Sequence, residues 1–372
     1  MFDMYSYLLG GGNGGSRPPY PETWDEFQAF IRSGLIKKVY ETGDQVFCKR
    51  GENLLVWDIL DFDKDKPIDP RYHHSVTLGL HDCWASLQFS ARQAFYVASE
   101  VLPIGTYNFY VNSHPWSDES VGKYFQFTTT KEIPVGGQLL FMQAYNATLE
   151  GASVNIYLSN TSTGNPNEVV TLTEGNGGTN LGTIYNAITE DFNSIQRALL
   201  GSNNWKDSAI RQLLNSSAAA GSVWTPQTKW DRKPEWNSTE KGWMNGIDAD
   251  FLAVIGDVTK ITAKTVMDGG GYDTTIDKFF LLSKEETYGG RENDIDEGGA
   301  YKYYSEFSDL PTAGGGEDTN RIKYLNGTAG WWWLRTPNAG NGYSVRIVNP
   351  TGAMTNYGAT NSNGFAPACV IW

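Results

Sequence analysis

The side chains that most often carry catalytic chemistry are few in this sequence and widely spread. The 372 residues include 4 histidines and 3 cysteines, which are His73, His74, His81, His114, Cys48, Cys83 and Cys369. A catalytic nucleophile needs a base and an orienting group beside it, and no GxSxG or HExxH segment provides such a set. No CxxC pair gives the cysteines the spacing of zinc ligands. We therefore predict that the protein is not an enzyme.

Two groups of carboxylates could hold a hard cation such as calcium. Asp61, Asp63 and Asp65 imitate the start of a calcium-binding loop, but Lys66 and Tyr72 stand where that loop needs glycine and glutamate. The pattern favours a solvated turn. A second acidic group allows either a calcium site or a solvated loop, of which the loop is favoured. Its members are Glu292, Asp294, Asp296 and Glu297. We predict no metal and no cofactor, with calcium as the open alternative.

Noncovalent recognition is the chemistry that residues 330–372 indicate. This stretch begins with Trp331–Trp333 and contains two apolar runs, Val345–Val348 and Ala366–Trp372. Aromatic and β-branched residues of this kind suit strands in a core. Between them lie mostly Asn, Tyr, Ser, Thr, Ala and Gly, the residues that antibody loops use for contact area and adaptable hydrogen bonds. Composition alone also allows a surface β-meander with polar turns.

Several motifs in the second half of the chain carry a resemblance to a known family. They are SAIRQLLNS, DADFLAVIGDVTKIT and DKFFLLSKEE, followed by WWLRTP, VRIVNPTGA and NGFAPACVI. With them, the sequence resembles the variable proteins of diversity-generating retroelements, which have a C-type-lectin-like fold and are common in phages and bacteria of the gut. In that family, adenine-directed mutagenesis rewrites selected codons near the 3′ end of the gene.

The resemblance implies a ligand-binding face made of the residues at the rewritten positions. These are Asn338, Asn341, Tyr343, Ser344, Thr355, Asn356, Tyr357, Ala359 and Thr360. We expect them on one solvent-exposed face, with Val345, Ile347, Val370 and the tryptophans buried beneath it. Tyr343 and Tyr357 are the expected hot spots. The sugar-reading tripeptides of calcium-dependent lectins are absent, so the fold name implies no sugar specificity.

The composition is that of an ordinary globular protein with a sizeable core. Hydrophobic residues make up 40% and charged residues 19%, and the formal net charge is −13. Nucleic acid and anionic membranes require a basic surface, so we predict neither as a partner. No stretch is long enough to span a bilayer, and the first residues lack the basic region of a signal peptide. One disulfide is allowed, but folding in a reducing cytoplasm is the simpler interpretation.

Periodicity and turn signals predict an α+β fold in three parts. We expect an arm and short helix over 1–40, a split C-type-lectin-like (formylglycine-generating-enzyme-like) domain over 41–86 and 183–372, and an inserted all-β, sandwich-like domain over 87–182. Thr23 and Glu26 are spaced as a capping box at the start of the short helix. Helical spacing continues from Thr183 to Gly201, and a second helix is expected to begin near residues 207–208.

We interpret the sequence as a retroelement-diversified ligand-binding protein, and the receptor-binding tip of a phage tail fibre suits the resemblance. Such a protein would be made in the host cytoplasm, join the virion, and recognise a host cell-surface protein or glycan. A homo-oligomer is expected, with a trimer favoured, because several weak sites gain avidity when presented together. The alternatives are a structural or enzymatic tail component with an inert C-terminal surface, or a bacterial surface adhesin.

Overall fold

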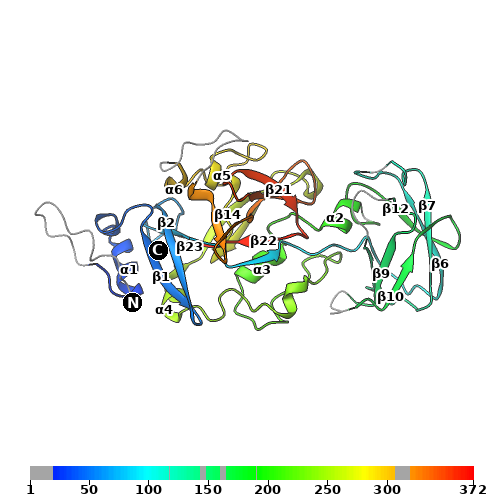
Figure 1. The fold of residues 1–372 in the computed structure, drawn as a ribbon, viewed down its shortest axis with the longest axis horizontal. Helices are drawn as coiled ribbons and strands as arrows, with labels where there is room; N and C mark the ends of the chain where they lie inside the picture. The colour runs from blue at the N-terminus through cyan, green and yellow to red at the C-terminus, as the bar shows by residue number, and fades with distance from the viewer. Residues whose placement is uncertain (1–19, 117, 143–147, 160–164, 190, 306–318) are drawn as a thin grey trace, which may run out of the picture.

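The protein is mixed α+β and mostly β, with 34% strand and 15% helix. The computed structural model describes residues 20–116, 118–142, 148–159, 165–189, 191–305 and 319–372. Figure 1 shows an elongated molecule with a main body in the middle, helix α1 near one end and two further sheets at the other. The expected N-terminal arm, residues 1–19, lies outside the described residues.

Two sheets form the main body, and each combines strands from distant parts of the chain. The larger has the order β1-β2-β3-β23-β13, with β16 also pairing with β23: β1 (Gln45–Arg50), β2 (Asn53–Phe62), β3 (Val76–Leu80), β23 (Ala368–Ile371), β13 (Ile255–Gly256) and β16 (Phe279–Phe280). The other has the order β21-β20-β19-β22-β4: β21 (Met354–Gly358), β20 (Ser344–Val348), β19 (Trp332–Pro337), β22 (Ser362–Phe365) and β4 (Ala85–Gln88). Residues 332–371 therefore supply strands to both sheets.

Short helices and two hairpins accompany the sheets. The α-helices are α1 (Trp24–Arg32), α2 (Ile195–Leu200), α3 (Ala209–Leu214), α4 (Ala249–Val254), α5 (Lys284–Tyr288) and α6 (Lys302–Ser305). The 3₁₀ helices are η2 (Ile36–Lys38), η3 (Glu235–Ser238), η4 (Val266–Asp268) and η5 (Thr319–Arg321). The hairpins are β14 (Val258–Ala263) with β15 (Tyr272–Asp277), and β17 (Lys323–Leu325) with β18 (Thr328–Gly330).

Two further sheets form the region that the sequence predicts as an all-β insertion. One has the order β10-β9-β8-β5 and the other β11-β7-β6-β12: β5 (Tyr96–Val97), β6 (Gly105–Val111), β7 (Tyr124–Thr129), β8 (Gln138–Phe141), β9 (Ser153–Tyr157), β10 (Glu168–Thr171), β11 (Thr173–Glu174) and β12 (Thr179–Ile184). Their apolar cluster extends from Phe95 to Leu199, so it includes α2, which lies beyond the predicted domain limit of residue 182.

The helix expected over residues 183–201 is wrong for most of its length. Thr183 and Ile184 end β12, where they pair in parallel with β6. A helix begins only at Ile195, where the side chain of Ser194 accepts a hydrogen bond from the backbone N–H of Gln196. Of the apolar residues at helical spacing, Ile184, Phe192, Ile195 and Leu199 are buried all the same, because strand, turn and helix each contribute to the same cluster. Ile188 is half-buried and lies outside this cluster. The other two helix starts are confirmed, with Thr23 capping α1 and Ser208 capping α3. The capping box at α1 is formed only in part, because the carboxylate of Glu26 accepts from the backbone N–H of Glu22 at 2.7 Å.

A buried ionic network connects β19, α5 and β14 beneath the five-stranded sheet. The guanidinium of Arg335 donates to both carboxylate oxygens of Glu286, and the Lys260 ammonium lies 2.9 Å from the same carboxylate. Lys260 also contacts Asp65, whose carboxylate accepts from the hydroxyl of Tyr301 at 2.8 Å. Asp65 is therefore an anchor of this network, and the prediction of a merely solvated turn around it is wrong.

Candidate ligand-binding groove

A groove of about 890 Å³ lies where the five-stranded sheet meets the inserted sheets and the segment that leads into η3. Ligand pockets occur preferentially at such junctions between domains. The β20–β21 hairpin and the turn after it contribute Tyr343, Ser344, Asn356, Tyr357, Gly358 and Thr360. The inserted sheets and the surrounding loops contribute Arg92, Leu140, Met142, Tyr157, Arg232, Lys233 and Glu235, among others.

The structure brings five of the nine residues predicted to bind ligand to this groove. They are Tyr343, Ser344, Asn356, Tyr357 and Thr360. Tyr357 is the most exposed of them, at 48%, whereas Asn356, Thr360 and Tyr343 are half-buried. Thr355, also half-buried, precedes Asn356 on β21.

Ser344 and Ala359 correct the expectation that the whole set is solvent-exposed. Ser344 is 3% exposed and Ala359 is 0% exposed. The backbone N–H of Ala359 donates to the carbonyl of Tyr343 at 3.0 Å, and its methyl group joins the main apolar cluster. The side chain of Ala359 is therefore a packing residue and cannot contact a ligand directly.

Asn338 and Asn341 form a turn instead of lining the groove. The side-chain oxygen of Asn341 accepts from the backbone N–H groups of Tyr343 and Ser344, at 3.1 and 2.7 Å. The corresponding oxygen of Asn338 accepts from the backbone of Gly340 at 3.2 Å. Asx turns of this kind fix the local backbone, so these two side chains act on the groove by holding Tyr343 and Ser344 in place.

Aromatic contacts tie the groove to both parts of the molecule. The ring of Tyr343 meets that of Trp116, from the inserted region, edge to face at a centroid distance of 5.2 Å. The ring of Tyr357 stacks on Trp331 at 6.2 Å. Trp331 is 42% exposed, which corrects the expectation that all three tryptophans are buried. The remaining residues expected beneath the face are fully buried, namely Trp332, Trp333, Val345, Ile347 and Val370.

Cationic side chains form part of the groove that the sequence did not indicate. Arg92 donates to the carbonyl of Phe141 at 2.9 Å, and the guanidinium of Arg232 lies 3.7 Å from the centre of the Tyr157 ring. Burial lowers the pKa of both guanidinium groups from their ordinary value, although both remain far above neutral pH. Lys233 is half-buried and makes no hydrogen bond or ion pair with the residues that the structure describes.

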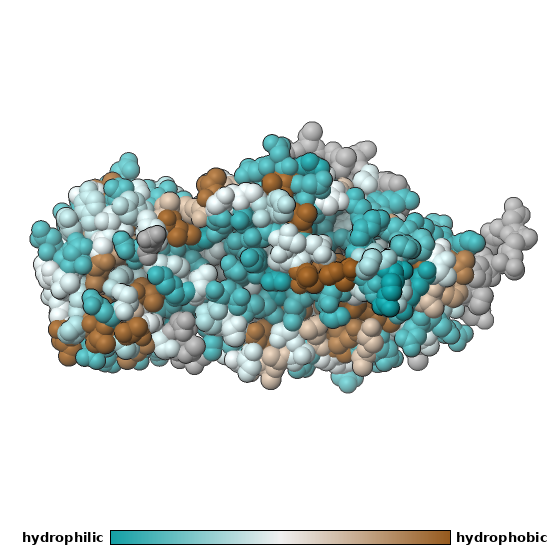
Figure 2. All heavy atoms as spheres, turned by 180° about the vertical axis from the view of Figure 1, so that it is seen from behind, coloured by the Kyte–Doolittle hydropathy of each residue, from teal (hydrophilic) through white to brown (hydrophobic). Residues whose placement is uncertain are grey.

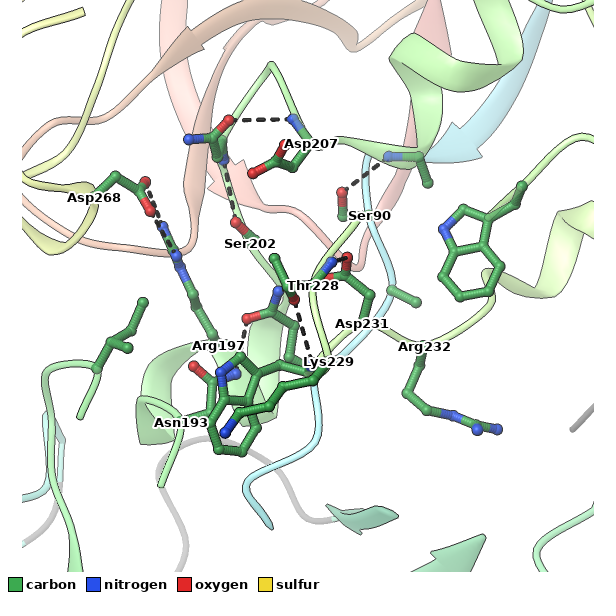
Figure 3. Close-up of a pocket in the computed structure, with 17 residues that line it drawn as sticks. Ser90, Asn193, Arg197, Ser202, Asp207, Thr228, Lys229, Asp231, Arg232 and Asp268 are labelled. Atoms are coloured by element: carbon green, nitrogen blue, oxygen red, sulfur yellow. Dashed lines mark hydrogen bonds and ion pairs between the residues drawn. The ribbon is translucent and has the colours of Figure 1, made fainter. Parts of the chain in front are cut away.

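A smaller pocket of about 270 Å³ lies beside α2 and is shown in Figure 3. It contains an ion pair between Arg197 and Asp268, in which two guanidinium nitrogens lie 2.9 and 2.6 Å from the carboxylate oxygens. Arg197 also donates to the carbonyl of Gly342 at 2.8 Å. Burial, followed by the charge of Asp231, raises the pKa of Asp207 in this pocket. Through the bond from Arg197 to Gly342, this pocket helps to hold the loop that carries Tyr343.

The acidic group predicted as a calcium site or a solvated loop is a solvated loop in part, because Asp294 and Asp296 are exposed whereas Glu292 and Glu297 are buried. Glu292 is 5% exposed and pairs with Arg346 at 2.9 Å and with Lys284 at 3.0 Å. Glu297 is 2% exposed and accepts from the hydroxyl of Thr336 at 2.6 Å. Burial raises the pKa of Glu297. Within the described residues, no group of three or more His, Cys, Asp or Glu side chains could hold a metal ion.

The histidines and cysteines lie outside the lining of the groove that the structure describes. The three cysteines are free and buried. Burial raises the pKa of Cys48 and Cys83 to about 12, and raises that of Cys369 as well. Because the thiolate is the reactive form, these thiols are poor nucleophiles near neutral pH. The groove is therefore equipped for binding through aromatic, amide, hydroxyl and cationic groups.

Comparison with protein families identifies a family for the second half of the chain. Residues 181–372 match the family described as Domain of unknown function (DUF6273), and this match covers slightly more than half of the chain. The protein belongs to this family. No curated protein and no solved structure matched the chain. Among the described residues, no helix has the length and apolarity needed to cross a membrane.

Proposed function

We propose that this chain is a ligand-binding protein and that the groove beside the β20–β21 hairpin is its binding site. The observation that carries the proposal is the convergence of Tyr343, Asn356, Tyr357 and Thr360 on one groove. Tyrosine offers large contact area at low entropic cost, and amide and hydroxyl groups adapt their hydrogen bonds to different partners. The apolar residues of β19 and β20 beneath this face are buried, so the core does not include the side chains of these four residues.

The proposal includes diversification of the groove by a retroelement and a C-type-lectin-like fold for the main body. Asn356 and Tyr357 lie on the edge strand of the five-stranded sheet, where changes of side chain disturb few neighbours. Ser344 and Ala359 are buried, so within the groove we assign the variable role to the exposed and half-buried positions. The inserted sheets contribute a second wall that lies outside the rewritten segment.

The biological setting that suits such a protein is the receptor-binding tip of a phage tail fibre. Its partner would be a molecule on the host cell surface, and a trimer would present several grooves together. Avidity can exceed the affinity of one site by about 10²–10⁴ when geometry allows joint engagement. The apolar face of helix α1 is packed on its own chain and does not offer an apolar surface to another subunit.

The DNA beside the gene tests the proposed diversification. We expect a second, non-coding copy of the segment that encodes residues 338–360, near a gene for a reverse transcriptase. The two copies should differ where the non-coding one has adenine, and the differences should fall on the codons for Tyr343, Asn356, Tyr357 and Thr360. A genome without this repeat, or with differences spread evenly over all bases, would refute diversification.

A further inference from the structure

The edge strand β21 offers unpaired backbone groups to the groove. Outside the ladder, Ala359 donates to Tyr343 and Asn349 donates to Ala353. These bonds continue the register in which Ser344 faces Gly358 and Arg346 faces Asn356. Hydrogen-bonded pairs alternate with non-bonded pairs in an antiparallel ladder, so Asn356 and Gly358 direct their backbone groups away from β20. Both residues line the groove, and β21 ends the sheet. Gly358 is buried and its carbonyl accepts from the backbone N–H of Asn361 at 3.0 Å, so the open part of the edge is centred on Asn356.

An edge of this kind binds an extended segment readily. Unpaired N–H and C=O groups along a sheet edge are a template for a further strand, and several peptide-binding domains use this mode. No described residue accepts from the backbone N–H of Asn356 or of Gly358. The side chains of Asn356 and Tyr357 would then contact alternate side chains of the added strand.

The groove is positively charged although the whole protein is acidic. Its described lining contains three cationic side chains, Arg92, Arg232 and Lys233, and one carboxylate, Glu235. The formal net charge of the chain is −13. Figure 2 shows the far side of the molecule from Figure 1, where hydrophilic residues cover much of the surface between the main body and the inserted sheets. Arg92 donates to a neutral carbonyl and is acted on by the charge of Glu235, whereas Lys233 has no described partner, so Lys233 offers the more available charge to an anion. A local reversal of charge selects ligands of the opposite sign and speeds their association.

We propose that the groove takes an extended, acidic peptide segment, which adds to β21 as a further strand and places its carboxylates against Arg92 and Lys233. This inference rests on the proposed function for the identity of the site and adds the class of ligand. The rewritten residues would select the sequence of the peptide. Arg92 and Lys233 lie outside the rewritten segment, so the preference for acidic ligands would persist between variants. The open backbone edge favours a peptide over an acidic glycan, because an extended peptide repeats its N–H and C=O groups at the spacing of a sheet edge.

A random peptide library displayed on ribosomes or phage tests the inference, since it requires no choice of ligand in advance. The full-length protein is immobilised, and bound peptides are sequenced and compared with the unselected library. The most enriched peptide is then synthesised and titrated by fluorescence anisotropy. Lys233→Glu is compared with Lys38→Glu, a control on an exposed lysine of η2, which is outside the lining of the groove and makes no ion pair with the described residues. The same peptide is also made in two N-methylated versions, one methylated at its odd-numbered residues and one at its even-numbered residues. Each version lacks the backbone donors along one of its two edges.

We expect enriched peptides to carry an excess of Asp and Glu. Lys233→Glu should weaken binding about tenfold or more, the loss typical of a charge-assisted hydrogen bond. Lys38→Glu should stay within about twofold, because a distant exposed charge is screened. Of the two N-methylated peptides, the one that lacks donors on the edge facing β21 should not bind, and the other should still bind. Enrichment without acidic bias, equal binding of both methylated peptides, or binding of an acidic oligosaccharide with no peptide enriched would overturn the inference.

Selection on Tyr357→Ala separates this inference from the proposed function. If both hold, the variant enriches different sequences that are still acidic. Unchanged sequences would refute the role of Tyr357 in selecting ligands while leaving the acidic-peptide site intact. Changed sequences without acidic bias would refute the inference while leaving the proposed function intact.

Discussion

Asn341→Ala should destabilise the protein although the sequence resemblance assigns this residue to a tolerant, diversified face. The side-chain oxygen of Asn341 accepts two backbone hydrogen bonds, from Tyr343 and Ser344. Alanine leaves both donors without this acceptor at a site where Ser344 is 3% exposed. A net loss of roughly 0.5–1.5 kcal/mol for each bond gives a decrease of about 1–3 kcal/mol in the free energy of unfolding. Urea unfolding followed by tryptophan fluorescence measures this difference.

Two variants make the comparison specific. Asn341→Asp keeps an acceptor oxygen in the same position and should lose much less stability than Asn341→Ala. Asn356→Ala removes an asparagine that makes no side-chain hydrogen bond to the described residues, and should change stability by no more than about 0.5 kcal/mol. If Asn341→Ala and Asn356→Ala unfold at the same urea concentration with equal slopes, the turn does not depend on Asn341 and the reasoning fails.

Three further predictions concern the core and the pH dependence. Trp333→Ala should cost roughly 3–5 kcal/mol in urea unfolding, because Trp333 is fully buried; a loss below about 1 kcal/mol would place it outside the core. Burial alone would raise the pKa of Glu286, but the charges of Arg335 and Lys260, with the hydrogen bonds to this carboxylate, together outweigh burial and hold this pKa at about 2. Glu286→Gln should therefore cost about 3–5 kcal/mol by leaving a buried charge unpaired, and Glu286→Gln with Arg335→Met should recover part of it, whereas additive losses would argue against the pair. The hydrogen bond to Asp58 raises the pKa of His81, so this pair stabilises the fold below about pH 6.5 and its contribution is lost as pH rises through the raised pKa. His81 is half exposed, so the melting temperature should fall only slightly over that range and His81→Gln should remove the fall; an unchanged slope would refute the assignment.

Caps and apolar runs in the sequence correctly predicted those elements whose structure depends on residues close to them in the chain. Thr23 caps α1 and Ser208 caps α3 because a hydroxyl three residues before a backbone N–H satisfies it directly. Trp332 and Trp333 are buried as expected, since large aromatic residues beside apolar runs have few alternatives to the core. The helical spacing before Gly201 predicted a helix that is too long, because a strand and a turn can bury residues at the same intervals as a helix.

Long-range pairing explains what the sequence did not show. Asp65 and Lys260 lie far apart in the chain, and their contact depends on the packing of β14 and α5, so the local sequence indicates only a solvated turn at Asp65. Arg92 precedes the inserted strands in the chain and Lys233 follows them, and neither belongs to a motif. The candidate face was predicted from residue types near the C-terminus, which cannot separate Tyr357, an exposed residue, from Ala359, a buried one.

The most direct test of the proposed function compares two exposed tyrosines in binding to bacterial cells. Tyr357 lies in the groove and is 48% exposed, whereas Tyr272 lies on β15 and is 55% exposed. The fluorescently labelled protein and its Tyr357→Ala and Tyr272→Ala variants are titrated by flow cytometry against a panel of gut bacterial strains, after their melting temperatures have been matched. We predict that the unchanged protein binds some strains, that Tyr357→Ala weakens this binding roughly tenfold or more, and that Tyr272→Ala leaves it unchanged. Equal affinities for all three proteins, or no binding to any strain, would contradict the account.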